Sequence, residues 1–377
     1  MTKHIRLILV FTVLAIVFFN SVILKAEVKN ENKPLKGNWD FKLQKLWEVE
    51  NAGNDLLTQI VDIQADDNGR IYILEWKQFK FFVFDQNGKF LYSFGNRGEG
   101  PGEYKMPFSF FLKGQYVIVP DQERVHYFDK DGKYVKSYNY GRQLFPRAFL
   151  DEFRFLMVQD NEDEKEKSDK LEIFDLNSMK RNAISEISAE KVLTASQGNL
   201  IMKFKDSTTT PMVVAAEHNN DIYFGKNDRY FIKKVDLNGK ELLSFSISGR
   251  DQKKIPEQVK RERFEKARFN NGRIPKEMID QMVKGMPDYC TYYSRISIAE
   301  NGLIYIYLND VTNKTAQEID IFSPEGKYLY HATAQLPEGL KRLGPIFLKG
   351  NSLILFVENE EGEQKLVNFQ IEIPGGK

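Results

Sequence analysis

Three histidines and one cysteine follow the first 26 residues, which limits the catalytic and metal chemistry open to this chain. His126 falls within one expected strand, His218 at an expected turn and His331 at the end of another strand. A three-histidine zinc site needs converging ligands, and these contexts place the histidines apart. Cys290 lacks a companion that would make it a nucleophile, so we interpret it as a small buried apolar residue. The sequence predicts no catalytic residue, no metal site and no cofactor.

Two other motifs could bind ions, but their surroundings do not fit. The glycine-rich stretch 95–102 is not followed by an expected helix, whose N-terminus a phosphate cradle requires. The Asp-Lys-Asp-Gly turn that begins at Asp129 lacks the downstream glutamate of a helix-loop-helix calcium loop. We interpret both motifs as loops of a β fold.

The elements around these residues repeat along the chain. A strand, a polar turn closed by glycine and a second strand recur in residues 81–94, 125–135, 234–243 and 319–329. Glycine suits this turn because a tight hairpin needs a residue with positive φ. Gly88 and Gly132 lie 44 residues apart, about the length of one four-stranded blade. The pattern predicts an all-β fold, a six-bladed β-propeller.

The expected blades cover residues 60–94, 108–138, 147–187, 212–247, 294–333 and 345–373. The last blade offers only three strands, and residues 43–49 can supply the fourth. Closing the ring in this way leaves no exposed sheet edge. The expected organisation is therefore a signal peptide at 1–26, a linker at 27–40 and the propeller at 41–377.

A family resemblance supports this organisation. Residues 66–107, including Phe94-Gly95-Asn96-Arg97-Gly98-Glu99-Gly100-Pro101-Gly102-Glu103-Tyr104, resemble an NHL-type repeat. The chain from 41 to 374 is more closely similar to exported bacterial six-bladed propellers related to NHL-repeat proteins. The resemblance implies the fold but little about activity, because such propellers mostly bind partners and only a few are enzymes.

Two segments depart from the repeat. Residues 254–287 have helical periodicity, interrupted by Asn270-Asn271-Gly272 and restarted at Pro275, which predicts a helical-hairpin insert between blades four and five. The insert is rich in Lys and Arg, so we expect one basic face. It is either a solvated helix pair that covers the ring or a lid that docks a partner. Residues 188–211, between blades three and four, contain one extra strand-like run.

The candidate binding residues lie on one face of the expected ring. Loops that enter a first strand and loops that join second to third strands share one face of a propeller, and the irregular, glycine-rich loops of this chain fall there. Loops on a rigid scaffold are where binding residues usually sit. The alternative for each charged residue is an ion pair with a neighbour in its loop. The candidates are Trp76, Arg97, Glu99, Asp121, Arg124, Arg229 and Asp310.

The N-terminus and the charge balance bear on location. Lys3 and Arg6 precede the apolar run 7–19, which is typical of a secretory signal cleaved after Ala26. An uncleaved membrane anchor is the alternative. Residues 27–377 contain three fewer basic side chains than the 54 of the whole chain and all 53 acidic ones, a net charge of about −2. This balance gives no global field for nucleic acid. We expect a monomer that is exported to the periplasm or associated with the cell envelope.

These observations predict a non-catalytic binding propeller of the cell envelope that recognises a protein, peptide or glycan through its loop-rich face. The alternative is a lyase or hydrolase that uses carboxylates or a divalent metal at the propeller channel. Stoichiometric, tightly held metal in the purified protein would favour the enzyme.

Overall fold

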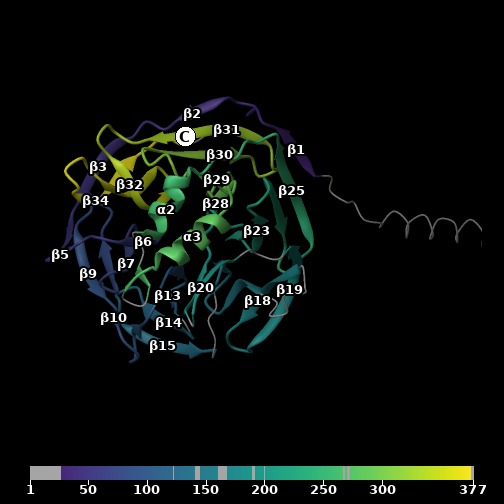
Figure 1. Ribbon diagram of the computed structural model, residues 1–377. Coiled ribbons are helices and arrows are strands. Elements are labelled where there is room, and N and C mark those ends of the chain that lie inside the picture. Colours follow the sequence, from purple (N-terminus) through teal and green to yellow (C-terminus); the bar gives the residue numbers. More distant parts are fainter. Residues whose placement is uncertain are drawn as a thin grey trace, which may run out of the picture.

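The computed structural model describes residues 27–121, 123–140, 145–159, 168–188, 192–198, 200–265, 268–269 and 272–374. Six β-sheets are arranged around a central axis, as Figure 1 shows, which confirms the predicted six-bladed propeller. The signal peptide predicted at 1–26 lies outside the described residues. No helix among the described residues is both long and apolar enough to cross a membrane.

Each blade is an antiparallel sheet of four repeating strands. Blade one contains β6 (Ile60–Ala65), β7 (Ile71–Glu75), β8 (Lys80–Phe84) and β9 (Phe90–Phe94). Blade two contains β12 (Phe111–Lys113), β13 (Tyr116–Pro120), β14 (Arg124–Asp129) and β15 (Tyr134–Asn139). Blade three contains β16 (Ala148–Phe149), β17 (Arg154–Gln159), β18 (Ser168–Asp175) and β19 (Lys180–Ser188). The first strands of neighbouring blades contact one another, so they line the central channel.

The second half of the ring follows the same plan. Blade four contains β22 (Val213–His218), β23 (Asp221–Lys226), β24 (Phe231–Val235) and β25 (Glu241–Ser248). Blade five contains β28 (Tyr293–Ile298), β29 (Ile304–Leu308), β30 (Ala316–Phe322) and β31 (Tyr328–Gln335). Blade six contains β32 (Lys341–Lys349), β33 (Ser352–Glu358) and β34 (Gln364–Gln370), and β3 (Gln44–Val49) completes it from the N-terminal side.

Strand β3 closes the ring as predicted. It runs antiparallel to β34, with Val49 opposite Leu366 and Gln44 opposite Gln370. The last blade is thus built from both ends of the propeller, and β34 is paired on both sides, by β3 and by β33.

Residues 27–40 differ from the linker that we expected. β1 (Val28–Glu31) pairs in parallel with β25, and β2 (Asn38–Asp40) pairs in parallel with β31. Together with β3 these residues form an N-terminal strap (residues 27–49) along the outer edges of blades four, five and six (Figure 1). Asn30 fixes its start, because its side-chain amide donates to the carbonyl oxygens of Ser246 at 3.0 Å and Gly326 at 2.9 Å.

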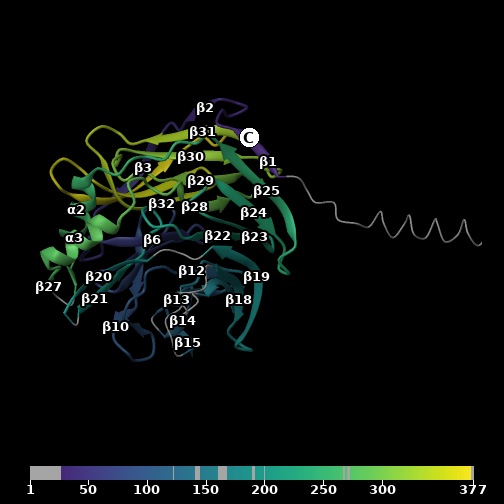
Figure 2. The same ribbon diagram turned by 45° about the vertical axis from the view of Figure 1, so that its right-hand side comes forward.

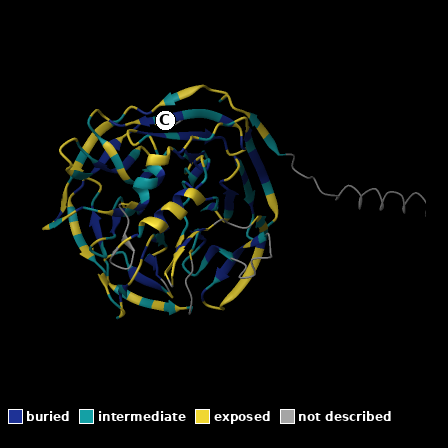
Figure 3. Cartoon of the chain, in the orientation of Figure 1, coloured by how far each residue is buried: buried dark blue, intermediate teal, exposed yellow. Residues whose placement is uncertain are grey.

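Apolar side chains between the sheets form the core. The middle strands β7 and β8 are buried along almost their whole length, whereas the outer strand β9 alternates between half-buried and exposed residues. Figure 3 shows the same contrast between inner and outer strands around the ring. A separate apolar cluster fills each interface between neighbouring blades. The blades are therefore held together by sheet-on-sheet burial.

Two inserts combine into a cap over one end of the ring. The predicted helical insert contains α2 (Glu257–Glu265), α3 (Lys276–Gly285) and the short pair β26 (Arg268–Phe269) and β27 (Gly272–Arg273). The insert before blade four forms the hairpin of β20 (Leu193–Gln197) and β21 (Leu200–Phe204). We call α2, α3 and this hairpin the cap. Its own core contains Leu193, Met202, Phe264, Met278 and Met282. Figure 2 shows the cap standing on one side of the ring.

Candidate binding site

The cap and an irregular loop of blade one lie on the same face of the ring. This loop, residues 95–107, is folded back on itself by the parallel pair of β10 (Asn96–Arg97) and β11 (Glu103–Tyr104). Figure 2 places β10 on the side that carries the cap. Gly98 lies close against the Glu103 side chain, where a Cβ atom would displace the carboxylate. The glycine-rich sequence thus serves close packing of the loop.

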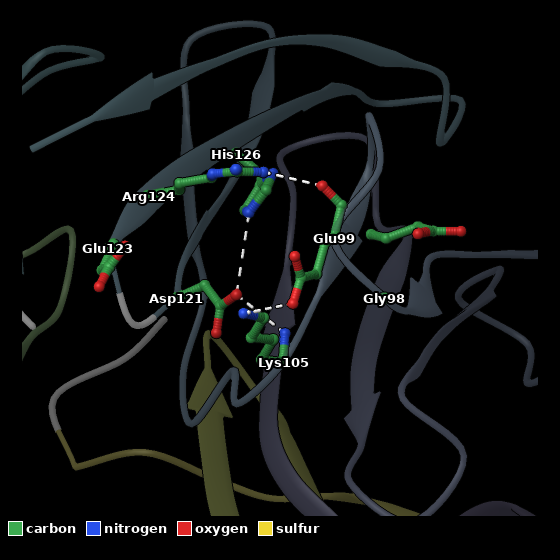
Figure 4. A pocket seen from close by; sticks show the side chains of 8 residues that line it. Gly98, Glu99, Lys105, Asp121, Glu123, Arg124 and His126 are labelled. Atoms are coloured by element: carbon green, nitrogen blue, oxygen red, sulfur yellow. Dashed lines mark hydrogen bonds and ion pairs between the residues drawn. The ribbon is translucent and has the colours of Figure 1, made fainter. Parts of the chain in front are cut away.

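A small polar pocket, with a cavity volume of about 60 Å³, opens beside this loop. Asp121 lines this pocket, and its carboxylate accepts hydrogen bonds from the backbone N–H groups of Lys105 at 2.8 Å and Met106 at 2.7 Å. These bonds tie the end of the blade-one loop to the second strand of blade two. The pocket, drawn in Figure 4, is lined by Gly98, Glu99, Glu103, Lys105, Asp121, Glu123, Arg124 and His126.

His126 lies at the inner wall of the polar pocket and is only 1% exposed. Figure 4 shows its ring facing Asp121, with 4.0 Å between Nε2 and Oδ2. Neither ring nitrogen has a hydrogen-bond partner among the described residues. Burial lowers the pKa of His126 to about 4, although the nearby Asp121 carboxylate opposes the shift. The imidazole is therefore neutral at neutral pH, with one donor and one acceptor available.

Charges at the outer edge of the pocket are mutually paired. Lys105 Nζ lies 2.7 Å from Glu99 Oε1, and the hydrogen bond and charge of this lysine hold the pKa of Glu99 below its usual value. Arg124 donates to the backbone oxygen of Glu99 at 2.9 Å. The edge thus carries both signs of charge, and the Glu99–Lys105 pair adds little net charge to it.

An aromatic row lies beside the polar pocket. The Arg97 guanidinium sits 5.1 Å from the centre of the Phe79 ring, and Phe79 packs against Trp76 with ring centres 5.5 Å apart. Trp76 in turn stacks on Phe108 at 4.8 Å, with the ring planes 18° apart. Phe79 adopts a positive φ of 56°, an uncommon conformation for a bulky residue. Such strain is maintained only where surrounding packing determines the backbone.

The row ends at a second pocket of about 180 Å³, which we call the apolar pocket because five of its eight lining residues are apolar. Phe108 is 48% exposed and Phe145 is 53% exposed, so both rings offer open apolar surface. Asp121 lines this pocket as well as the polar one, and the two pockets therefore meet at this residue. The apolar pocket is lined by Met106, Phe108, Ser109, Pro120, Asp121, Phe145, Pro146 and Arg147.

The structure brings five of the seven candidate residues to this region. Glu99, Asp121 and Arg124 line the polar pocket, while Trp76 and Arg97 belong to the aromatic row.

The other two candidates lie in loops of blades four and five and line neither pocket. Arg229 packs its guanidinium 5.2 Å from the centre of the Phe231 ring. Asp310 accepts hydrogen bonds from the backbone N–H groups of Thr312 at 2.9 Å and Asn313 at 3.1 Å. Burial acts to raise the pKa of Asp310, but hydrogen bonds from the Thr312 hydroxyl and from these two N–H groups hold it below its usual value and fix the turn. A structural role fits Asp310.

Sequence reasoning missed His126, Phe79 and Phe108 as members of the site. His126 was considered only as a zinc ligand, although a histidine inside the apolar run Val125-His126-Tyr127-Phe128 is itself unusual. The signal for Phe108 was weaker, because an isolated aromatic residue in a loop is common. Its partner Trp76 is distant in sequence, so their stacking follows from the tertiary fold alone.

The cap carries less free positive charge than its composition suggests. Lys260 is buried and binds Asp288 at 2.8 Å, and Arg261 binds Asp280 at 2.8 Å. Arg263 pairs with Asp206, in the segment that joins β21 to blade four. These pairs join the cap elements to one another and to the ring, so the basic residues of α2 are largely structural.

Two carboxylates lie on strands that line the channel, Asp62 on β6 and Glu217 on β22. Asp62, on β6, has its pKa raised to about 6 by burial, against hydrogen bonding from Phe110 N–H and attraction by Arg295. Lys113 of blade two pairs with Glu217 of blade four at 2.5 Å. The described residues contain no group of three or more His, Cys, Asp or Glu side chains that could hold a metal ion.

Comparisons with known proteins agree with the architecture. Residues 50–280 match a family that is described as a 6-bladed beta-propeller. A protein of Bacteroides fragilis NCTC 9343, named an exported protein by inference, superposes with a TM-score of 0.51 at 14% identity, over 92% of this chain and 99% of that one. A DUF4221 family member from Bacteroides vulgatus ATCC 8482 superposes with a TM-score of 0.54 at 11% identity, over 88% of this chain and 98% of that one. No curated protein matches the chain. These identities show the fold alone.

Proposed function

The chain belongs to the DUF5128 family of six-bladed β-propellers, and we propose that it is a non-catalytic binding propeller of the cell envelope. It recognises a protein, peptide or glycan through the face that carries the cap and the two pockets. Propellers present variable loops on a rigid ring, and ligands bind where those loops converge.

One observation carries the proposal: a polar pocket and an apolar pocket meet at Asp121 on the loop-rich face. Binding sites typically combine apolar and aromatic walls with a few fixed polar groups that set orientation. Phe108 supplies the first component, and Asp121 with His126 supplies the second. The loop 95–107, which borders both pockets, is tied down by the two bonds to Asp121, so little ordering is needed when a ligand arrives.

The base of the cap adds rigidity to the same face. The Asn227 side-chain amide donates to the backbone oxygens of Ser207 at 2.7 Å and Tyr293 at 2.8 Å. Asn309 donates to Ser207 O at 3.0 Å. Since a buried amide that is fully bonded resists rearrangement, these contacts fix the segment between β21 and blade four, from which the cap hairpin extends.

Location at the envelope is part of the proposal and is supported by the N-terminal sequence. The basic head, apolar run and Ala26 are typical of a secretory signal. The mature protein then begins with the strap, whose first strand is already paired with blade four.

The test is capture of ligands from a solubilised envelope fraction with three immobilised proteins: wild type, Phe108→Ala and Leu91→Ala. Leu91 is 40% exposed on the outer strand β9, so its variant is a matched control for loss of exposed apolar surface. We expect a ligand that wild type and Leu91→Ala retain and that Phe108→Ala loses. Capture that is equal for all three proteins would contradict the proposed face.

The lyase or hydrolase alternative is favoured by one observation, the raised pKa of Asp62 in the channel. A carboxyl group that titrates near pH 6 can exchange protons with a substrate near neutral pH. Turnover of a polysaccharide or lactone that is abolished by Asp62→Asn and unaffected by Phe108→Ala would favour this function over binding.

A further inference from the structure

We propose that the ligand of the two joined pockets is a neutral saccharide, with one sugar ring stacked on Phe108 and a sugar hydroxyl bonded to His126. This inference rests on the proposed binding function and names the chemistry of its ligand. It combines two independent observations, a buried histidine without partners among the described residues and an aromatic row that ends in an exposed ring.

The unpartnered ring of His126 favours a hydroxyl group. A neutral imidazole has one N–H donor and one acceptor nitrogen, and leaving either buried without a partner costs about 1–3 kcal/mol. A hydroxyl can donate to one nitrogen or accept from the other. An ammonium or guanidinium group could only donate, which would leave the imidazole N–H unpaired. Ligand hydroxyls therefore match this wall of the pocket better than a cationic side chain.

The charges around His126 disfavour an anionic ligand. Four carboxylates line the polar pocket, those of Glu99, Glu103, Asp121 and Glu123, against the two cations Lys105 and Arg124. A phosphate or carboxylate would meet this excess of negative charge and could satisfy only the donor of His126. A neutral polyol avoids both penalties, since carboxylates accept readily from hydroxyl groups.

Phe108 supplies the apolar half of the recognition. Trp76 packs against one side of the Phe108 ring, and Trp76 is itself in contact with Phe79. This backing holds the ring in one orientation, so a flat ligand loses little free energy in ordering it. Pro120, Phe145 and Pro146 complete the apolar walls. A pyranose presents a flat C–H face to such a ring and hydroxyls at its edge, which fits the step from the apolar to the polar pocket at Asp121.

The experiment is isothermal titration of the purified protein with neutral hexasaccharides of glucose (α-1,4 and β-1,4 linked), xylose, mannose and N-acetylglucosamine. A peptide array of random dodecamers is the second probe. The variants are Phe108→Ala with its control Leu91→Ala, and His126→Leu with its control His218→Leu, since His218 ends the first strand of blade four and lines neither pocket. His126→Gln, which keeps one donor and one acceptor, covers the case in which His126→Leu fails to fold.

We expect at least one hexasaccharide to bind, with affinity reduced about tenfold or more by Phe108→Ala and by His126→Leu. His126→Gln should lose less affinity than His126→Leu, and both controls should bind as wild type does. The affinity should be unchanged between low and high salt, because a neutral ligand makes no screened ion pairs.

Three results would overturn the inference. Saccharide binding that is insensitive to both site variants would place the sugar elsewhere. Peptide binding that Phe108→Ala abolishes, without any saccharide binding, would reject the saccharide but keep the proposed binding face. Binding of neither probe, together with envelope capture that is equal for all variants, would reject the saccharide and the proposed function.

Discussion

Trp47 of the closing strand lies directly against Gly88 in the hairpin of blade one. A Cβ atom on Gly88 would lie 2.7 Å from indole Cδ2, and indole Nε1 donates to the carbonyl oxygen of Gln86 at 2.9 Å. The same contact recurs around the ring, where Phe94 of blade one covers Gly132 of blade two and Phe245 of blade four covers Gly326 of blade five. Trp47 thus supplies at the joint what the outer strand of a preceding blade supplies elsewhere.

This packing predicts that Gly88→Ala is more damaging than a glycine substitution in a similar but open hairpin. Gly362 is the control, since its φ is 83° against 80° for Gly88 and no described atom lies within 4 Å of the point that an added methyl group would occupy. Gly362→Ala should cost on the order of 1–2 kcal/mol through positive φ alone. Gly88→Ala should cost about 1–3 kcal/mol more, because Trp47 must move. Urea unfolding measures both free energies.

A double substitution identifies the cause. In a Trp47→Ala background, the extra cost of Gly88→Ala should largely disappear, because the methyl group then enters vacated space. Equal costs for Gly88→Ala and Gly362→Ala in the wild-type background would show that Trp47 does not constrain this turn.

Local sequence was enough to predict the blades. The turns at Gly88, Gly132, Gly239 and Gly326 combine positive φ with alternating apolar strands, and both signals lie within a dozen residues. The closing strand was predicted by counting the strands of each blade, because blade six was one strand short. The covering of Gly88 by Trp47 could not be predicted, since it joins residues whose contact depends on closure of the whole ring.

The strap and the candidate site were harder to predict from the sequence, for a physical reason. Val28-Lys29-Asn30-Glu31 lacks an apolar strand pattern, and β1 is held by backbone pairing to an edge and by Asn30. The cap core joins Met202 to Met282 across a whole blade, so neither insert reveals it alone. The site residues Asp121 and Arg124 were predicted from their loop, whereas His126 was missed because its burial and lack of partners are tertiary properties.

Removal of the strap should destabilise the protein in two steps. Deleting residues 27–40 removes only the parallel strands β1 and β2, and we expect a modest decrease in melting temperature. Deleting residues 27–49 also removes β3, exposes β34 and uncovers Gly88, which should cost several kcal/mol more through lost burial of Trp47 and Val49. Calorimetry on both deletions is the measurement. Equal melting temperatures for the two would contradict closure by β3.

The propeller should tolerate removal of the whole cap but not removal of one part of it. Replacing residues 254–287 alone by a Gly-Ser linker uncovers Leu193, Met202 and Phe204 of the hairpin, so this variant should bind a hydrophobic dye and aggregate. Replacing residues 193–204 as well should restore a soluble, folded ring, because neither insert contributes a strand to a blade. Circular dichroism and dye binding compare the two. A double replacement that unfolds would mean that the cap is part of the propeller core.

Export predicts a defined mature terminus. The secretory pattern should lead to cleavage after Ala26, so that the exported protein begins at Glu27. N-terminal sequencing of protein from the envelope fraction checks this, and a retained Met1 would support the membrane-anchor alternative.

Asp62 should make the folded protein less stable as the pH rises. Its pKa is about 6 in the folded state and 3.8 in the ordinary, solvated state, because burial disfavours the charged carboxylate. The stabilising effect of the neutral form is fully present below pH 3.8 and is lost as the pH rises through 6. Asp62→Asn removes the titration, so it should match wild type near pH 4 and exceed it at pH 7.5 by about 1–3 kcal/mol. Asp67→Asn is the control with the opposite sign, since the hydrogen bond and charge of Lys349 lower the pKa of Asp67 and make its charged form favourable. Urea unfolding at both pH values measures the difference in the free energy of unfolding. An Asp62→Asn variant that is no more stable than wild type at pH 7.5 would show that water in the channel solvates this carboxylate.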